Sequence, residues 1–209
     1  MRAGIADGLP LYIRAPSSMG SDVYRSTPDF ARGAAHVIAK GRDIALIGTG
    51  LGTSLCVQAA ARLKESGLSP TVVDMVYLKP FDGETLCRLA REGHSLLVVE
   101  EHNTTSGLAS LVAEALGRNG IAARLEAVGL PDGDLAVAVP QQILNRYGLT
   151  VDGVLARARA LVRSPADCTK LRATRSTPSE RPNFRSSSSL SVSAPVGSAT
   201  CGALMPVCS

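Results

Sequence analysis

Residues 43–67 read DIALIGTGLGTSLCVQAAARLKESG, and this stretch decides the fold class. Its first eight residues form a nearly continuous apolar run, which is typical of a strand buried on both faces of a sheet. Apolar residues then recur at helical spacing at Leu55, Ala59 and Leu63, and Gly67 is a typical residue to end the helix. The stretch therefore predicts a buried strand, a glycine-rich turn and a helix.

The same alternation continues along the chain as far as Arg163. Strands and helices separated by short loops favour a three-layer, doubly wound α/β domain with a mostly parallel sheet. Residues 34–39 fit either an edge strand or a helical turn. Asp82 and Thr150 are expected to begin the helices that follow them. The other predicted strands cover residues 9–16, 43–50, 70–80, 95–101 and 123–131, and the helices cover residues 51–67, 81–93, 107–120, 139–148 and 151–162.

The composition changes after Arg163. Residues 164–209 are rich in Ser, Pro and Arg and have no hydrophobic periodicity. Such a segment buries too little apolar surface to offset the entropy of ordering it, so we predict a disordered tail. Its five basic and two acidic residues carry +3 of the formal net charge of +4, which leaves the rest of the chain close to neutral. Charge therefore gives no reason to expect a nucleic-acid partner.

Cysteine spacing and hydropathy exclude several classes. Three of the five cysteines lie in the tail, and Cys56 and Cys87 lie in predicted helices. No pair has the spacing of a metal site or a disulfide framework, and free thiols favour the reducing cytoplasm. No apolar run reaches the length of a membrane span, so we expect no membrane partner.

The third buried strand ends in Glu100, Glu101, His102 and Asn103. Open α/β sheets bind ligands at the carboxyl ends of their strands, and paired carboxylates beside a histidine can act as acid and base. However, adjacent strand residues point to opposite faces, so the two glutamates are poorly placed to chelate one metal ion. A carboxylate here is also typical of a residue that binds the free amides of the next helix or pairs across an interface. We predict a loop or interface element, with no catalytic residue and no metal ligand.

Two further patterns leave alternatives open. Gly48 and Gly50 fit the start of the dinucleotide pattern G-x-G-x-x-G, but Thr53 replaces its third glycine. Asp74 lies about where a ribose-binding acid would, so a small dinucleotide-binding domain remains an alternative function. Arg14, at the end of a predicted strand, fits either an anion contact or a surface salt bridge.

Taken in order, several stretches resemble the C-terminal part of the transketolase family. The closest likeness is to the C-terminal subunit of split transketolases, and the C-terminal domain of deoxyxylulose-5-phosphate synthase is a more distant match. The likeness covers residues 1–163 and follows a set of separated motifs. They are GLPLYIRAP (8–16), AKGRDIALIGTG (39–50), VVDMVYLKPFD (72–82), VVEEHNTTSGLASLVAEAL (98–116) and RYGLTVDGVLARARALV (146–162).

The resemblance implies a domain organisation. Residues 1–20 are similar to the end of the family's pyrimidine-binding domain, residues 30–163 to its C-terminal domain, and residues 164–209 have no family counterpart. The family uses thiamine diphosphate with Mg²⁺, held between a diphosphate-binding and a pyrimidine-binding domain. We therefore expect the cofactor only in a complete assembly, and none bound by this chain alone.

The resemblance also implies a role and weak substrate contacts. Arg14 matches the family's strand arginine, but Ser17 stands where a second, phosphate-binding arginine is common. Ser106 and Ala109 replace glycines of the G-G-L-G-S loop, which predicts a stiffer loop. We expect a support and dimerisation domain of a transketolase-like transferase, a fragment that is inactive alone. The expected partner is a second copy or a subunit with the missing domains. A stand-alone protein-interaction module is the alternative.

Overall fold

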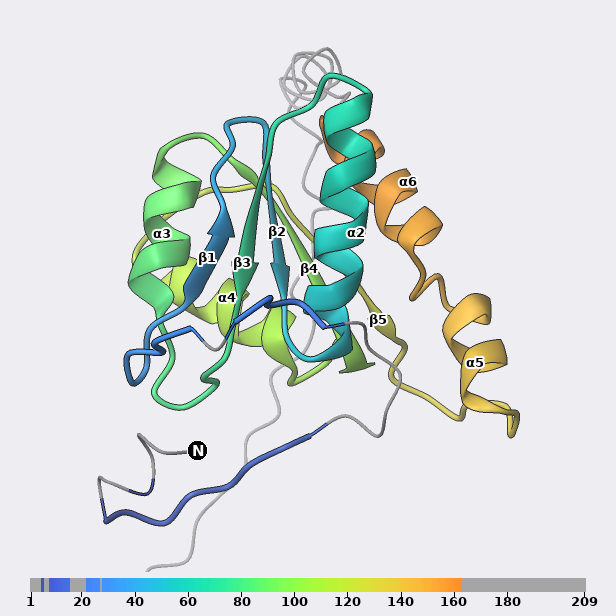
Figure 1. Ribbon diagram of the computed structural model, residues 1–209, viewed down its shortest axis with the longest axis horizontal. Coiled ribbons are helices and arrows are strands. Elements are labelled where there is room, and N and C mark those ends of the chain that lie inside the picture. Colours follow the sequence, from blue (N-terminus) through green and yellow to red (C-terminus); the bar gives the residue numbers. More distant parts are fainter. Residues whose placement is uncertain (1–4, 6–7, 16–21, 27, 163–209) are drawn as a thin grey trace, which may run out of the picture.

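The computed structural model describes residue 5 and residues 8–15, 22–26 and 28–162 (Figure 1). Ser17 and the predicted tail, residues 164–209, lie outside the described residues. The strands and helices follow the chain as β1 (His36–Ala39), β2 (Ile44–Gly48), α2 (Leu51–Glu65), β3 (Pro70–Asp74), α3 (Gly83–Arg91), β4 (Ser95–Asn103), α4 (Leu108–Arg118), β5 (Leu125–Leu130), α5 (Pro140–Arg146) and α6 (Val151–Val162).

The described strands form one sheet in the order β1-β3-β2-β4-β5. β1 pairs antiparallel with β3, and the other pairings are parallel. In the centre, Ile44 of β2 lies opposite Pro70 of β3 and Ser95 of β4. The residues for which the sequence allowed a strand or a helical turn thus form an antiparallel edge strand. The mostly parallel sheet confirms the predicted fold class.

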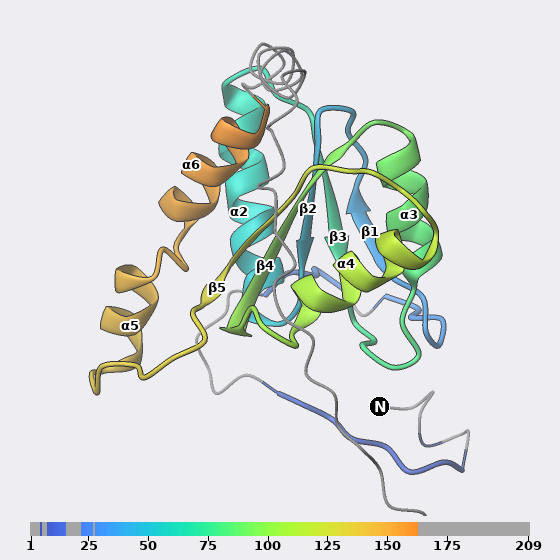
Figure 2. The same cartoon turned by 180° about the vertical axis from the view of Figure 1, so that it is seen from behind.

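Helices cover both faces of the sheet (Figures 1 and 2). Ile44 and Leu46 of β2 pack into a core with α2 and α6, whereas Ala45 and Ile47 point to the other face and pack with α3 and α4. All four side chains are fully buried. Because successive strand residues alternate between faces, a strand that is apolar at every position requires helices on both sides.

The helices begin and end as the sequence predicts. Gly67, with φ of 84°, follows α2, and its amide donates to the Lys64 carbonyl at 3.0 Å. The next amide, of Leu68, donates to the Leu63 carbonyl at 3.1 Å. These bonds satisfy carbonyl groups that the last turn leaves free. At the start of α6, the hydroxyl of Thr150 accepts the amide of Gly153 at 3.1 Å.

The strand predicted over residues 95–101 continues to Asn103, so residues predicted to form a loop lie in β4. Two other predicted strands differ more from the structure. Residues 9–15 form no strand, because the segment is exposed throughout and no described strand lies beside it. The strand predicted over residues 70–80 ends at Asp74. The reason is that both neighbouring strands run out there: Gly48 of β2 and His36 of β1 each lie opposite Asp74.

α5 lies at the margin of the domain, where its partly buried Leu144 packs against the core that contains α2 and α6. No residue of α5 is buried, and Figures 1 and 2 show the helix below α6, away from the sheet. In the loop before it, Val137 is fully exposed and Val139 is 60% exposed. Both valines thus present apolar side chains to solvent immediately before α5. Within the described part of the chain, no helix has the length and apolar character needed to cross a membrane.

Asp82 provides a test of how α3 begins. Its carboxylate accepts the Thr85 amide at 3.0 Å, the Thr85 hydroxyl at 2.8 Å and the Ala35 amide at 2.9 Å. Partial burial alone would raise the pKa of Asp82, but these hydrogen bonds and the charge of Arg88 lower it overall. Protonation therefore favours the unfolded chain. The contribution of Asp82 is complete above its unfolded pKa of about 3.9 and is lost as pH falls through the lower folded value.

We expect Asp82→Ala to lower the free energy of unfolding by about 1 kcal/mol at pH 7, because the helix loses its N-cap. Asp82→Asn keeps one acceptor oxygen and should lose less. Urea unfolding measured from pH 7 to pH 3 checks both, and below pH 5 each variant should lose stability less steeply than the parent chain. An unchanged slope in both would contradict the assigned role.

Candidate functional site

The predicted site residues gather at one edge of the sheet. The parallel strands β2, β3 and β4 end together there, and we call this the carboxyl edge. β2 and β4 are neighbours, yet the helices that follow them cover opposite faces. Such a switch point is where open α/β sheets place their ligands. Residues 8–15, termed the strap, pass below this edge in Figures 1 and 2.

Glu100 is committed to holding a helix. Its side chain is 3% exposed, and its two carboxylate oxygens accept the amides of Leu108 at 2.7 Å and Ala109 at 3.0 Å. These are the free amides of the first turn of α4, where a negative charge is stabilised by the helix dipole. A β-carbon at Gly107 would lie 2.1 Å from Glu100 Oε2, so only glycine lets the carboxylate approach. Glu100 therefore joins the end of β4 to the start of α4.

Glu101, His102 and Arg14 form a chain of polar contacts. Glu101 Oε1 lies 3.4 Å from His102 Nε2, and Arg14 Nη2 donates to His102 Nδ1 at 3.0 Å. Glu101 also faces the start of α2, because a β-carbon at Gly50 would lie 3.7 Å from its Oε1. The structure thus brings the predicted Arg14 to the predicted glutamate–histidine pair. No sequence pattern indicates this contact, because 88 positions separate Arg14 from His102.

Asn103 shapes the loop that follows β4. Its side-chain oxygen accepts the amide of Thr105 at 2.7 Å, and its side-chain nitrogen donates to Asp132 at 3.0 Å. The first bond is an Asx-turn, which fixes the exit of the strand. The second ties this loop to the loop after β5. Both contacts are structural.

Sequence reasoning missed a second polar cluster at the carboxyl edge. Asp74 accepts hydrogen bonds from the Tyr24 hydroxyl at 2.7 Å and the Thr53 hydroxyl at 2.8 Å. Burial, the hydrogen bond and the charge of Asp74 raise the pKa of the Tyr24 hydroxyl far above its usual value. Burial, and then the charge of Asp74, likewise raise the pKa of the Cys56 thiol. The tyrosine and the cysteine therefore stay protonated and serve as packing groups rather than nucleophiles.

These contacts disfavour the dinucleotide alternative. A β-carbon at Gly52 would lie 2.0 Å from the Val99 carbonyl oxygen, so this glycine is required for α2 to pack against β4. Asp74 is 9% exposed and already bound by two hydroxyl groups, which leaves it unavailable for a ribose. In addition, Glu101 places a negative charge before the start of α2, where a pyrophosphate would lie.

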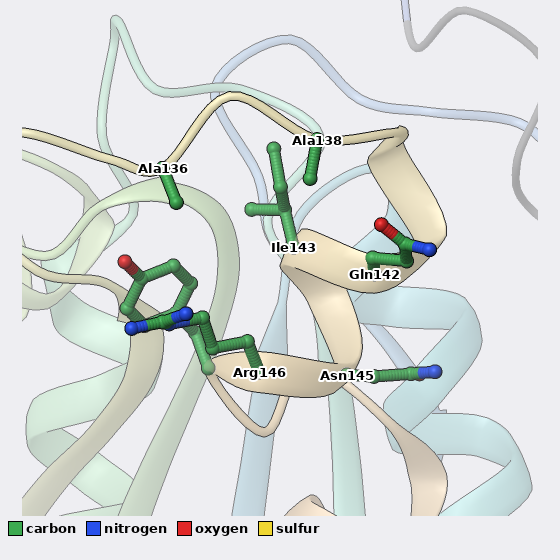
Figure 3. Close-up of a pocket in the computed structure, with 7 residues that line it drawn as sticks. Ala136, Ala138, Gln142, Ile143, Asn145 and Arg146 are labelled. Carbon is green, nitrogen blue, oxygen red and sulfur yellow. The ribbon is translucent and has the colours of Figure 1, made fainter.

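A pocket of about 490 Å³ lies away from the carboxyl-edge residues (Figure 3). It lies between α5 and the loop before it, and Arg146 is the charged side chain of a lining that is otherwise apolar or neutral. Arg146 and Asn145 are exposed, so no buried polar group is aimed into it. The remaining lining residues are Ala136, Ala138, Gln142, Ile143 and Tyr147. The pocket is a shallow hollow beside an uncovered helix and has no catalytic chemistry.

The acids of the carboxyl edge do not form a cluster of metal ligands in the described part of the chain. Among the described residues, no group of three or more His, Cys, Asp or Glu side chains could hold a metal ion. Glu100 is engaged by α4, and Asp74 by two hydroxyl groups. Of the predicted substrate contacts, Arg14 lies at the carboxyl edge, whereas Ser17 is outside the described residues.

Comparison with known proteins identifies the family. Residues 33–154 match the family described as "Transketolase, C-terminal domain". The chain belongs to the transketolase C-terminal domain family. It is 39% identical over 130 residues to 1-deoxy-D-xylulose-5-phosphate synthase of Symbiobacterium thermophilum, covering 62% of this chain and 20% of that protein. It is 31% identical over 155 residues to an apulose-4-phosphate transketolase subunit of Phocaeicola vulgatus, covering 74% of this chain and 49% of that subunit.

A solved structure shows the same architecture. The chain matches a split-gene transketolase, described as an inactive beta4 tetramer, with a TM-score of 0.63 and 32% identity. The match covers 68% of this chain and 46% of that one. This transketolase C-terminal domain therefore spans half or less of the length of these relatives.

Ser106, a departure from the family motif, has a strained backbone conformation. Ser106, which takes the place of the first glycine in the family's G-G-L-G-S loop, has φ of 63°. A residue with a β-carbon is strained in this left-handed region. The Ser106 amide still donates to the Ser110 hydroxyl at 2.9 Å, so the loop keeps its shape. A glycine at this position would adopt the same backbone conformation without that strain.

Glu100→Gln should lower the free energy of unfolding by about 1–3 kcal/mol, because the amide group turns a donor toward one of the two buried backbone amides. Glu101→Gln, whose side chain is partly exposed, is the matched control and should change stability by less than about 0.5 kcal/mol. Thermal and urea unfolding measure both. Equal effects of the two changes would remove the special role of Glu100.

Ser106→Gly should stabilise the domain by up to about 1 kcal/mol, because relief of the left-handed strain exceeds the added entropy of the unfolded chain. Ser110→Ala is the companion change, and it should destabilise the loop because the Ser106 amide loses its acceptor. Urea unfolding midpoints measure both. A destabilised Ser106→Gly chain would show that the strain is compensated elsewhere.

Proposed function

We propose that this chain is the C-terminal support and dimerisation domain of a thiamine-diphosphate-dependent, transketolase-like enzyme that transfers ketol or aldehyde groups. The observation that carries the proposal is that the buried acids at the carboxyl edge are engaged in hydrogen bonds that hold the fold together. Glu100 binds the start of α4, and Asp74 binds two hydroxyl groups. The chain therefore supports chemistry performed by other domains, and it is inactive alone.

The thiamine chemistry is assigned to partner domains. Among the described residues, no group of three or more His, Cys, Asp or Glu side chains could hold Mg²⁺. The proposal places the cofactor between a diphosphate-binding and a pyrimidine-binding domain of the assembly. The relatives support an arrangement of this kind, because one of them is named as a subunit of a transketolase. Residues 1–20 are proposed to be the end of a pyrimidine-binding domain, and the cytoplasm is the proposed location.

Exposed apolar side chains at two places in the chain favour contact with a partner protein. In the strap, Leu11, Tyr12 and Ile13 are all exposed, with Tyr12 at 89%. Before α5, Val137 and Val139 are exposed beside the pocket of Figure 3. Apolar surface of this kind typically marks contacts with another protein. We propose that residues 136–147, termed the α5 region, pack against a second copy of this chain or the partner subunit. We also propose that Arg14 borders the substrate entrance.

A stand-alone interaction module is the second candidate, because the same exposed surfaces would serve it. The two functions differ in what binds. A support domain binds a polypeptide that carries the two thiamine-binding domains, whereas a module binds a protein without them.

Two measurements test the proposed function. Titration calorimetry of the purified chain with thiamine diphosphate and Mg²⁺ should show no saturable heat. Capture of the tagged chain from its source cells, followed by native mass spectrometry, should yield a complex heavier than 21.7 kDa that contains the two thiamine-binding domains. Saturable cofactor binding by the chain alone would contradict the proposal, and a partner without those domains would favour the module.

Val137→Asp with Val139→Asp should weaken this complex at least tenfold, or about 1.4 kcal/mol, because two charges are placed on an apolar contact. The matched control is Lys64→Asp, which changes the net charge by the same amount on α2. Its side chain is exposed on another part of the molecule. If Lys64→Asp weakens the complex equally, the α5 region does not form part of the interface.

A further inference from the structure

One polar contact connects the strap to the body of the domain. Every residue of the strap is exposed, so packing contributes little to holding it. In the described part of the chain, the side-chain hydrogen bond that joins it to the sheet is the one from Arg14 Nη2 to His102 Nδ1, 3.0 Å long. The position of Arg14 at the carboxyl edge therefore depends on His102.

The chemistry of the two side chains fixes where the protons lie. A guanidinium group has five N–H donors and no acceptor, so His102 Nδ1 must accept with its lone pair. The ring proton then lies on Nε2, which faces Glu101 Oε1 at 3.4 Å. Only the neutral ring, with its proton on Nε2, can make both contacts. A protonated ring carries N–H on both nitrogens and turns a donor and a positive charge toward Arg14.

We propose that His102 is a proton-sensitive positioning residue: neutral His102 holds Arg14 and the strap at the carboxyl edge, and protonated His102 releases them. Histidine is the side chain that ordinarily changes its charge between pH 5 and pH 8. Among the described residues, the ionisable groups that contact the ring are Arg14 from the strap and Glu101 from β4. Asp132, from the loop after β5, binds the neighbouring Asn103.

Glu101 keeps the His102 ring in place when Arg14 is released. When His102 gains a proton, its Nε2–H still points at the Glu101 carboxylate, and the neutral contact becomes an ion pair. The ring therefore stays on β4 while Arg14 is repelled. The freed guanidinium is then available to another anionic group at this edge. This inference goes beyond the proposed function, because it concerns only residues of this chain and needs neither the cofactor nor a partner.

Nuclear magnetic resonance of the full ¹⁵N-labelled chain tests the proposal. The heteronuclear NOE and amide shifts of residues 11–14 report the order of the strap at pH 8 and pH 5.5. In the parent chain, we expect the NOE of these residues to fall at pH 5.5 and their shifts to move toward those of a free segment. Amides in β2 and β4 should keep their NOE at both pH values.

Variants separate positioning from general structure. His102→Asn keeps an oxygen acceptor near the position of Nδ1 and cannot gain a proton, so the strap should stay ordered at both pH values. His102→Leu removes the acceptor, and the strap should be mobile at both. Arg14→Gln should give the same mobility as His102→Leu while the sheet amides remain unchanged.

Two outcomes would overturn the proposal. One is a strap equally ordered at pH 8 and pH 5.5 in the parent chain. The other is a pH transition that persists in His102→Asn, which would assign it to His36 or His94, the other histidines of the chain. Failure of the proposed function would leave these results unaffected, because no assembly or cofactor enters the measurement.

Discussion

The structure depends on a pair of central parallel strands that have no solvent-facing side. Residues 44–47 of β2 and residues 96–99 of β4 are apolar and buried at every position, so their side chains alternate between two cores. Each face therefore needs helices, and α2 with α6 and α3 with α4 supply them. The three-layer arrangement follows from this requirement.

The carboxyl edge shows how a fold creates polar groups that look catalytic. Where β4 leaves the core, the chain needs groups that satisfy the free amides of α4, and Glu100 does so. Where β3 ends, Asp74 receives two hydroxyl groups. Both acids are buried and fully engaged, so neither is free to exchange a proton with a substrate. The more exposed Glu101 and His102 are the groups at this edge that retain freedom to respond to their surroundings.

The division of labour proposed for this family member has a physical basis. A sheet with both faces covered and its acids engaged is a rigid support, and rigid supports hold catalytic groups of neighbouring domains in place. Its exposed apolar side chains, in the strap and in the loop before α5, belong to neither core. They can contact a partner without disturbing the fold. The strap is held less firmly than the sheet and its helices. Among the described residues, the Arg14–His102 hydrogen bond, and not apolar burial, keeps it at the carboxyl edge.

Local patterns in the amino-acid sequence suffice for the fold class, the helix limits at Gly67, Asp82 and Thr150, and the family, because these depend on periodicity, caps and ordered motifs. They also indicate that Glu100 could bind helix amides. They wrongly predict a strand over residues 9–15 and a β3 that continues past Asp74, because strand length depends on neighbours that one segment cannot reveal. The contacts of Arg14 with His102 and of Tyr24 with Asp74 arise only in the folded domain. They join residues 88 and 50 positions apart in the chain, and only the folded arrangement brings their side chains within hydrogen-bond distance.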